Sequence, residues 1–135
     1  LHSFPTRRSS DLPTEASMAA ANYKLDNLVV IVDRNGLQIS GPTENVMALE
    51  PLSDKFKSFG YSIREVDGHD LTELIRAFRA VPFEKGKPSL IIAHTIKGKG
   101  VSFMENQAKW HHGVPSPDQM SEALRELDSE RKSYA

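Results

Sequence analysis

The sequence contains no cysteine among its 135 residues. Disulfide bonds, thiolate catalysis and cysteine-ligated metal sites are therefore excluded, and the composition suits a reducing compartment, so we expect a cytoplasmic protein. No apolar run approaches the ~20 residues that a membrane-spanning helix needs, so no membrane association is expected. The net charge of −1, with no basic stripe, argues against a nucleic-acid partner.

With 39% hydrophobic and 26% charged residues, the composition is typical of one globular domain that can bury a core. Residues 1–12, LHSFPTRRSSDL, do not fit this pattern, because they are polar and show no periodicity. No apolar segment follows Arg7 and Arg8, so they do not form a twin-arginine export signal. They resemble a translated sequencing adapter, and we expect a non-native or disordered leader followed by a domain over residues 13–135.

The central feature is a short apolar run, Leu28 to Val32, that ends in the polar loop DRNG. Most of its residues are β-branched, which favours a strand buried on both faces of a parallel sheet. Ligands of open α/β sheets bind beyond the carboxyl ends of strands, so the loop is a candidate site. The alternative is an ordinary turn in which Asp, Asn and Gly serve backbone geometry.

The rest of the chain predicts strands that alternate with helices. Helices are expected over residues 13–24, 52–59, 70–81 and from 116 to about 127, and further strands over 61–66 and 89–94. This order predicts an α/β fold, a three-layer arrangement with a parallel sheet and helices on both faces. The carboxyl ends of the three strands would then share one edge. They carry three polar pairs, which are Asp33/Asn35, Asp67/His69 and Thr95/Lys97.

Two helices have clear start signals. Asp70 with Glu73, and Ser116 with Gln119, have the spacing of capping boxes. In the first of these helices an apolar stripe is expected to be buried, and it comprises Leu71, Leu74, Ile75 and Phe78. The second helix is expected to decay after Leu127.

A long loop over residues 96–116 joins the last strand to the last helix. Its Lys97-Gly98-Lys99-Gly100 segment lacks the full spacing of a phosphate-binding loop, so a mobile solvated loop and a ligand-facing loop both stay open. Adjacent histidines on an extended backbone point to opposite sides, so at most one of His111 and His112 would face a ligand. Surface histidines beside a packing anchor, Trp110, are the other possibility.

Four segments in register carry a family resemblance: KLDNLVVIVDRNGLQISG, VDGHD, KPSLIIAHTIKGKGVSFME and WHHGVP. From about Met18 to about Arg131 the chain resembles the thiamine-diphosphate-binding domain of the transketolase family, especially its separately encoded N-terminal subunit. The resemblance implies thiamine diphosphate and Mg²⁺ as cofactors. It also implies transfer of a two-carbon ketol unit between sugar phosphates in the intact parent.

The resemblance also implies roles for individual residues. The Asn35 side chain and the Leu37 carbonyl would be metal ligands, of the hard oxygen type that Mg²⁺ prefers. Gly36 would also be a cofactor-binding residue, and Ile39 would pack against the thiazolium side. His112 would be the catalytic histidine, and Lys97 would contact the phosphates.

The chain also departs from the family pattern. The Gly-Asp-Gly motif that supplies another metal ligand is absent, so we expect a partial domain that is inactive alone. Its partner would be a pyrimidine-binding domain or subunit, in a homodimer or heterotetramer. A 1-deoxyxylulose-5-phosphate synthase, a 2-oxo-acid dehydrogenase component and a non-catalytic α/β module stay as alternatives. A dinucleotide-binding domain is disfavoured, because no glycine-rich turn follows the first strand.

Overall fold

The computed structural model describes residues 12–133. The predicted leader therefore lies outside the described residues, except for Leu12, where the first helix begins. The described residues form two compact units, one of residues 12–33 and 51–94 and the other of residues 34–50 and 95–133. The helices and strands of the first unit are α1 (Leu12–Asn22), β1 (Val29–Arg34, whose last residue belongs to the second unit), α3 (Leu52–Ser58), β4 (Ser62–Asp67), α4 (Leu71–Arg79) and β5 (Ser89–His94).

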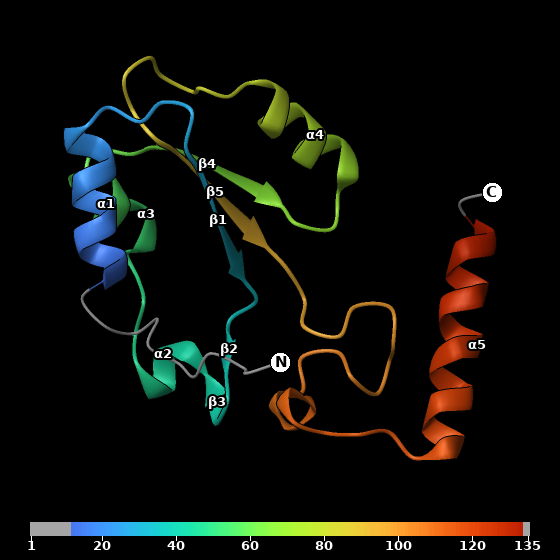
Figure 1. Ribbon diagram of the computed structural model, residues 1–135. Helices are drawn as coiled ribbons and strands as arrows, with labels where there is room; N and C mark the ends of the chain where they lie inside the picture. The colour runs from blue at the N-terminus through green and yellow to red at the C-terminus, as the bar shows by residue number, and fades with distance from the viewer. Residues whose placement is uncertain (1–11, 134–135) are drawn as a thin grey trace, which may run out of the picture. The chain divides into compact units, whose positions relative to one another are not determined.

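A three-stranded sheet in the order β1-β5-β4 forms the centre of the first unit (Figure 1). Strands β4 and β5 are parallel, with Ser62 opposite Ser89 and Asp67 opposite His94. Five of the six residues of β5 are buried, because this strand lies between the other two. The predicted α/β fold with a parallel sheet is confirmed.

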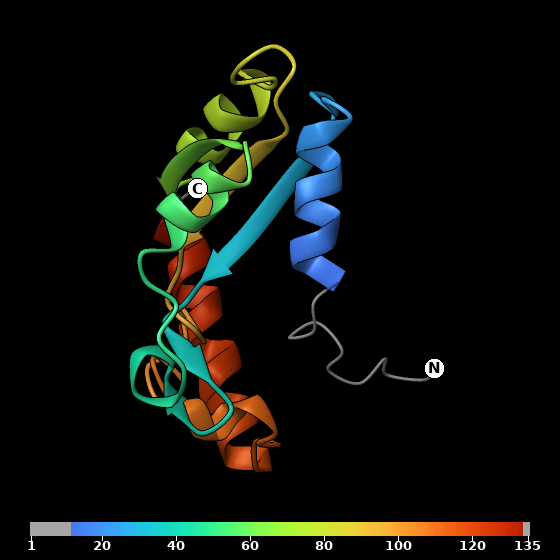
Figure 2. The same cartoon turned by 90° about the vertical axis from the view of Figure 1, so that its left-hand side faces the viewer.

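Helices cover both faces of this sheet. On one face Leu90 and Ile92 of β5 form a core with Ala20 of α1 and Tyr61, and Phe56 of α3 packs against it. Figure 2 shows α1 running alongside β1. Helix α4 lies on the other side of the sheet, as Figure 1 shows. The predicted three-layer arrangement is therefore correct.

Two burial predictions were wrong. Strand β1 is not buried on both faces, because it is an edge strand of the described sheet and Ile31 is 53% exposed. The predicted stripe of α4 is also largely exposed, at 73% for Leu71, 49% for Ile75 and 45% for Phe78, whereas Ala77 is 2% exposed. A three-stranded sheet offers too narrow a surface to cover the whole apolar side of the helix.

The second unit contains the other elements. They are β2 (Leu37–Gln38), β3 (Gly41–Pro42), α2 (Thr43–Val46), the 3-10 helix η2 (Ala108–His111) and α5 (Pro117–Ser133). Ser116 and Gln119 cap α5 reciprocally, as predicted, with N–H to side-chain oxygen distances of 3.0 and 3.3 Å. The helix continues to Ser133 instead of decaying after Leu127. None of the helices in residues 12–133 has the length and apolarity to cross a membrane.

Candidate functional site

The segment after β1 folds into a small hairpin that the sequence analysis did not predict. Strands β2 and β3 are antiparallel, with Leu37 opposite Pro42. Gly36 precedes the hairpin at a φ of +73°, a conformation that glycine adopts without strain. The Thr43 N–H donates to the Gly36 carbonyl at 2.9 Å, so Gly36 and Thr43 form a hydrogen-bonded pair.

This register directs the Leu37 backbone away from β3. Hydrogen-bonded and non-hydrogen-bonded pairs alternate along antiparallel strands, so Leu37 and Pro42 form a non-hydrogen-bonded pair. Proline also has no N–H to donate. On its outer side the Leu37 N–H donates to Asn35 Oδ1 at 2.9 Å. The Asn35 side chain is therefore fixed beside the outward-facing backbone of Leu37.

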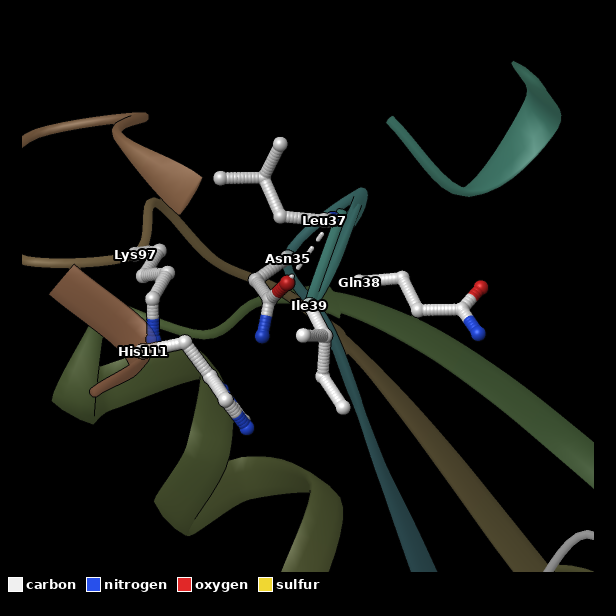
Figure 3. Close-up of a pocket in the computed structure, with 6 residues that line it drawn as sticks. All are labelled: Asn35, Leu37, Gln38, Ile39, Lys97 and His111. Carbon is white, nitrogen blue, oxygen red and sulfur yellow. Dashed lines mark hydrogen bonds between the residues drawn. The ribbon is translucent and has the colours of Figure 1, made fainter. Parts of the chain in front are cut away.

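A pocket lies on this outer side, wholly within the second unit (Figure 3). Its lining residues are Asn35, Leu37, Gln38, Ile39, Lys97 and His111. In Figure 3 the Asn35 amide lies between Lys97 and His111 on one side and Ile39 on the other. The structure thus brings together four of the residues selected from the sequence, together with Gln38 and His111.

Lys97 is held by a closed loop. The Asn106 N–H donates to the Lys97 carbonyl at 2.9 Å, and the Val101 N–H donates to the Gly98 carbonyl at 3.2 Å. The Gly100 N–H donates to Glu105 Oε1 at 3.1 Å. These bonds give the loop a defined path, and Lys97 lines the pocket.

The two adjacent histidines are close neighbours. They lie at the end of η2 and not on an extended backbone, and their ring centroids are 4.4 Å apart in an edge-to-face arrangement. His111 lines the pocket, whereas His112 is not among its lining residues. The Trp110 Nε1–H donates to the Phe103 carbonyl at 3.0 Å, which anchors η2 to the loop. The proposed packing role of Trp110 agrees with this contact.

Two other predicted residues belong to the first unit. The Asp67 Oδ1 accepts from the His69 N–H at 2.8 Å, a local turn bond at the end of β4. At the carboxyl end of β4, the polar side chain of Asp67 therefore shapes the local backbone turn.

The pocket offers oxygen donors but not a complete metal site. Among the described residues no group of three or more His, Asp or Glu side chains could hold a metal ion. The Asn35 amide oxygen retains a second lone pair, and the Leu37 carbonyl is directed away from β3. These hard oxygen donors suit Mg²⁺, which completes its six ligands with water and substrate phosphates.

Gln38 and His111 line the pocket but were not selected from the sequence, whereas His112 was selected and is not among the lining residues. Gln38 carries no distinctive signal. His111 is the first of the two adjacent histidines, but the family resemblance indicated the second, His112, which precedes Gly113.

Comparison with known proteins gives a consistent family assignment. Residues 10–133 match the family model described as transketolase, thiamine diphosphate binding domain. The chain is 56% identical over 117 residues to an apulose-4-phosphate transketolase subunit of Phocaeicola vulgatus, covering 87% of this chain and 41% of that protein. It is 39% identical over 110 residues to human transketolase, covering 82% and 17%.

The fold comparison agrees. The crystal structure of transketolase from Campylobacter jejuni superposes with a TM-score of 0.69 at 23% identity, over 93% of this chain and 24% of that one. The chain spans about two fifths of the length of the Phocaeicola vulgatus relative. Since the family model matches nearly the whole chain, the chain belongs to the transketolase family and corresponds to part of its thiamine diphosphate binding domain.

Proposed function

We propose that this chain is part of a transketolase that moves a two-carbon ketol unit between sugar phosphates, with thiamine diphosphate and Mg²⁺ as cofactors. The observation that carries the proposal is the pocket, in which Asn35, the outward-facing Leu37 backbone and Lys97 meet. The names of the apulose-4-phosphate transketolase relatives support a sugar-phosphate substrate.

Each residue has a role that its chemistry suits. The Asn35 amide oxygen and the Leu37 carbonyl bind Mg²⁺, and the Lys97 ammonium neutralises diphosphate oxygens. Gly36 keeps the two oxygen donors close together, and Ile39 supplies an apolar wall. Bound thiamine diphosphate would supply the carbanion chemistry, because it acts as an electron sink.

The histidines provide proton-transfer and hydrogen-bonding groups. We propose His112 as the catalytic histidine, which hydrogen-bonds a substrate hydroxyl or moves a proton, a function that suits an imidazole near neutral pH. His111 packs against His112 and also lines the pocket. It would therefore hold the His112 ring in place.

We propose that a partner completes the site. Within these residues Asn35 and Leu37 supply two ligands for Mg²⁺, and water, the diphosphate and the absent Gly-Asp-Gly segment would supply the others. Relatives that are named as one subunit of a transketolase support a second, pyrimidine-binding subunit or domain. We propose a dimer or heterotetramer of such chains in the cytoplasm, and no activity for these 135 residues alone.

A calorimetric titration tests this proposal. Thiamine diphosphate with Mg²⁺ is added to a complete subunit, which carries these residues behind a Gly-Asp-Gly segment, mixed with a candidate second subunit. The same titration is made into this chain alone. Binding by the pair and none by the chain is the expected result. No binding by either would favour the non-catalytic module, and ketol transfer by the chain alone would contradict its dependence on a partner.

A pair of variants tests the site. Asn35→Ala removes a proposed metal ligand, so it should weaken Mg²⁺-dependent cofactor binding at least tenfold, or ~1.4 kcal/mol. His69→Ala is the matched control, because His69 lies at another strand end in the other unit. Equal effects of the two variants would count against the assignment of Asn35. Assays with ketose phosphates and with 2-oxo acids separate a transketolase from the related enzymes.

A further inference from the structure

Arg34, the residue before Asn35, has an unusually well-connected side chain. It is 11% exposed, and its Nη2 lies 2.8 Å from Glu44 Oε1 and 3.0 Å from Glu50 Oε1. Its Nη1 donates to Thr43 Oγ1 at 3.0 Å. All four residues belong to the second unit. One guanidinium therefore ties the end of β1 to α2 and to the segment that follows α2.

Thr43 extends this network to residues 35–37, the proposed metal-binding turn. Its N–H and its hydroxyl both point at the Gly36 carbonyl, at 2.9 and 3.3 Å. The N–H of the same peptide unit, which belongs to Leu37, donates to Asn35 Oδ1. The Gly36–Leu37 peptide is thus held at its oxygen by Thr43 and at its nitrogen by Asn35.

We propose that Arg34 is a positioning residue for the metal-binding turn, and this inference rests on the proposed function. The guanidinium fixes Thr43, Thr43 fixes the Gly36–Leu37 peptide, and that peptide sets the direction of the Asn35 amide and the Leu37 carbonyl. A site that binds a metal ion needs its ligands held within ~0.5 Å, so loosening this turn weakens binding.

Charge gives Arg34 a second effect on the same turn. Glu44 and Glu50 are exposed, at 43% and 56% of their side chains, and both pair with Nη2 of Arg34. Arg34 offsets one of these two negative charges. Without it, the two carboxylates would repel each other and loosen the segment that holds Thr43.

Lysine is a poor substitute at this position. Its ammonium is a point charge, whereas the planar guanidinium offers five donors in a fixed fork. A lysine would keep the positive charge but could not hold Thr43, Glu44 and Glu50 together in the same geometry. The Arg34→Lys variant therefore separates the charge effect from the geometric effect.

The test uses the complete two-subunit protein. Arg34→Met, Arg34→Lys and Thr43→Val are compared with a matched control, Arg125→Met, which removes a surface arginine whose Nη2 lies 3.9 Å from Glu122 Oε1. Mg²⁺ is titrated at fixed thiamine diphosphate, and amide hydrogen exchange at Leu37 and Thr43 is measured without cofactor.

Arg34→Met should raise the Kd for Mg²⁺ about tenfold, the size of one lost charge-assisted hydrogen bond. Arg34→Lys should lie between Arg34→Met and wild type, and Arg125→Met should match wild type. Exchange at Leu37 and Thr43 should quicken in Arg34→Met. Thr43→Val should change both measurements in the same direction, and it decides the question if Arg34→Met does not fold.

The outcomes are distinguishable. Unchanged exchange and unchanged Mg²⁺ affinity in Arg34→Met and Thr43→Val would overturn the positioning role while leaving the proposed function intact. Failure of the wild-type assembly to bind thiamine diphosphate would overturn the proposed function, and with it the contribution of Arg34 to binding.

Discussion

Gly98, in the loop that holds Lys97, leaves no room for a side chain. It has a φ of +74°, and a Cβ built there would lie 2.7 Å from the Met104 carbonyl oxygen and 2.9 Å from the Met104 carbonyl carbon. Both are backbone atoms, so the contact cannot be relieved by rotating a side chain. Gly98→Ala must therefore move the loop or strain it.

The expected loss has two parts. A non-glycine residue at positive φ costs ~1 kcal/mol, and overpacking against fixed backbone adds about 1–3 kcal/mol. Gly36 provides the control in the same unit, since its φ is +73° but a Cβ there would have no atom within 4 Å. We expect Gly98→Ala to lose about 3 kcal/mol of unfolding free energy and Gly36→Ala about 1 kcal/mol.

Thermal unfolding of the two variants and the wild type, without cofactor, measures the difference. For a domain of this size these losses lower Tm by roughly 10 °C and 4 °C, respectively. Equal shifts in the two variants would refute the argument, because the contact with Met104 would then add nothing to the backbone strain. A loss in Gly36→Ala larger than in Gly98→Ala would refute it as well.

Two other changes test the second unit. Ser102 donates to Glu126 from its backbone N–H and from its hydroxyl, and these bonds hold the carboxyl pKa below its ordinary value of 4.5. Because the pKa of Glu126 is lower in the folded than in the unfolded state, its charged carboxylate stabilises the fold at pH values above the unfolded-state pKa. This stabilisation is lost as the pH falls through the folded-state pKa. The Tm gap between wild type and Glu126→Gln should therefore narrow below about pH 4.5, and a gap independent of pH would contradict this. In Gly113→Ala the added Cβ would lie 2.7 Å from the ring of Trp110, the only tryptophan in the sequence. The indole should therefore move, and the tryptophan fluorescence should shift to the red. An unchanged spectrum would mean that the indole does not move.

The order and the type of most elements could be predicted from local signals. The apolar run in residues 89–94 predicted a strand, and β5 has these bounds. The capping box of Ser116 and Gln119 predicted the start of α5, because its two hydrogen bonds involve only neighbouring residues. Parallel topology then followed from the alternation of strands and helices.

Burial could not be predicted from the same signals. β1 and β5 have similar apolar β-branched runs, and only the pairing order decides which of them is the edge strand. The stripe of α4 has helical spacing, but how much of it is buried depends on the width of the sheet below it. Periodicity identifies an apolar side of a helix, and the tertiary contacts determine whether anything covers it.

The same distinction applies to the site, where the order of elements could be predicted but the contacts between distant residues could not. Topology alone indicated that Asn35 and Lys97 follow strands with a common carboxyl edge, and both line the pocket. The details that fix their geometry depend on residues distant in sequence, such as Glu44 and Glu50, which lie ten and sixteen positions beyond Arg34. Strands of two residues are too short to show alternation, so the hairpin that turns the Leu37 backbone outward has no pattern of its own. The pocket-lining residues Asn35 and Lys97 could therefore be selected from the sequence, whereas the contacts that orient them require the structure.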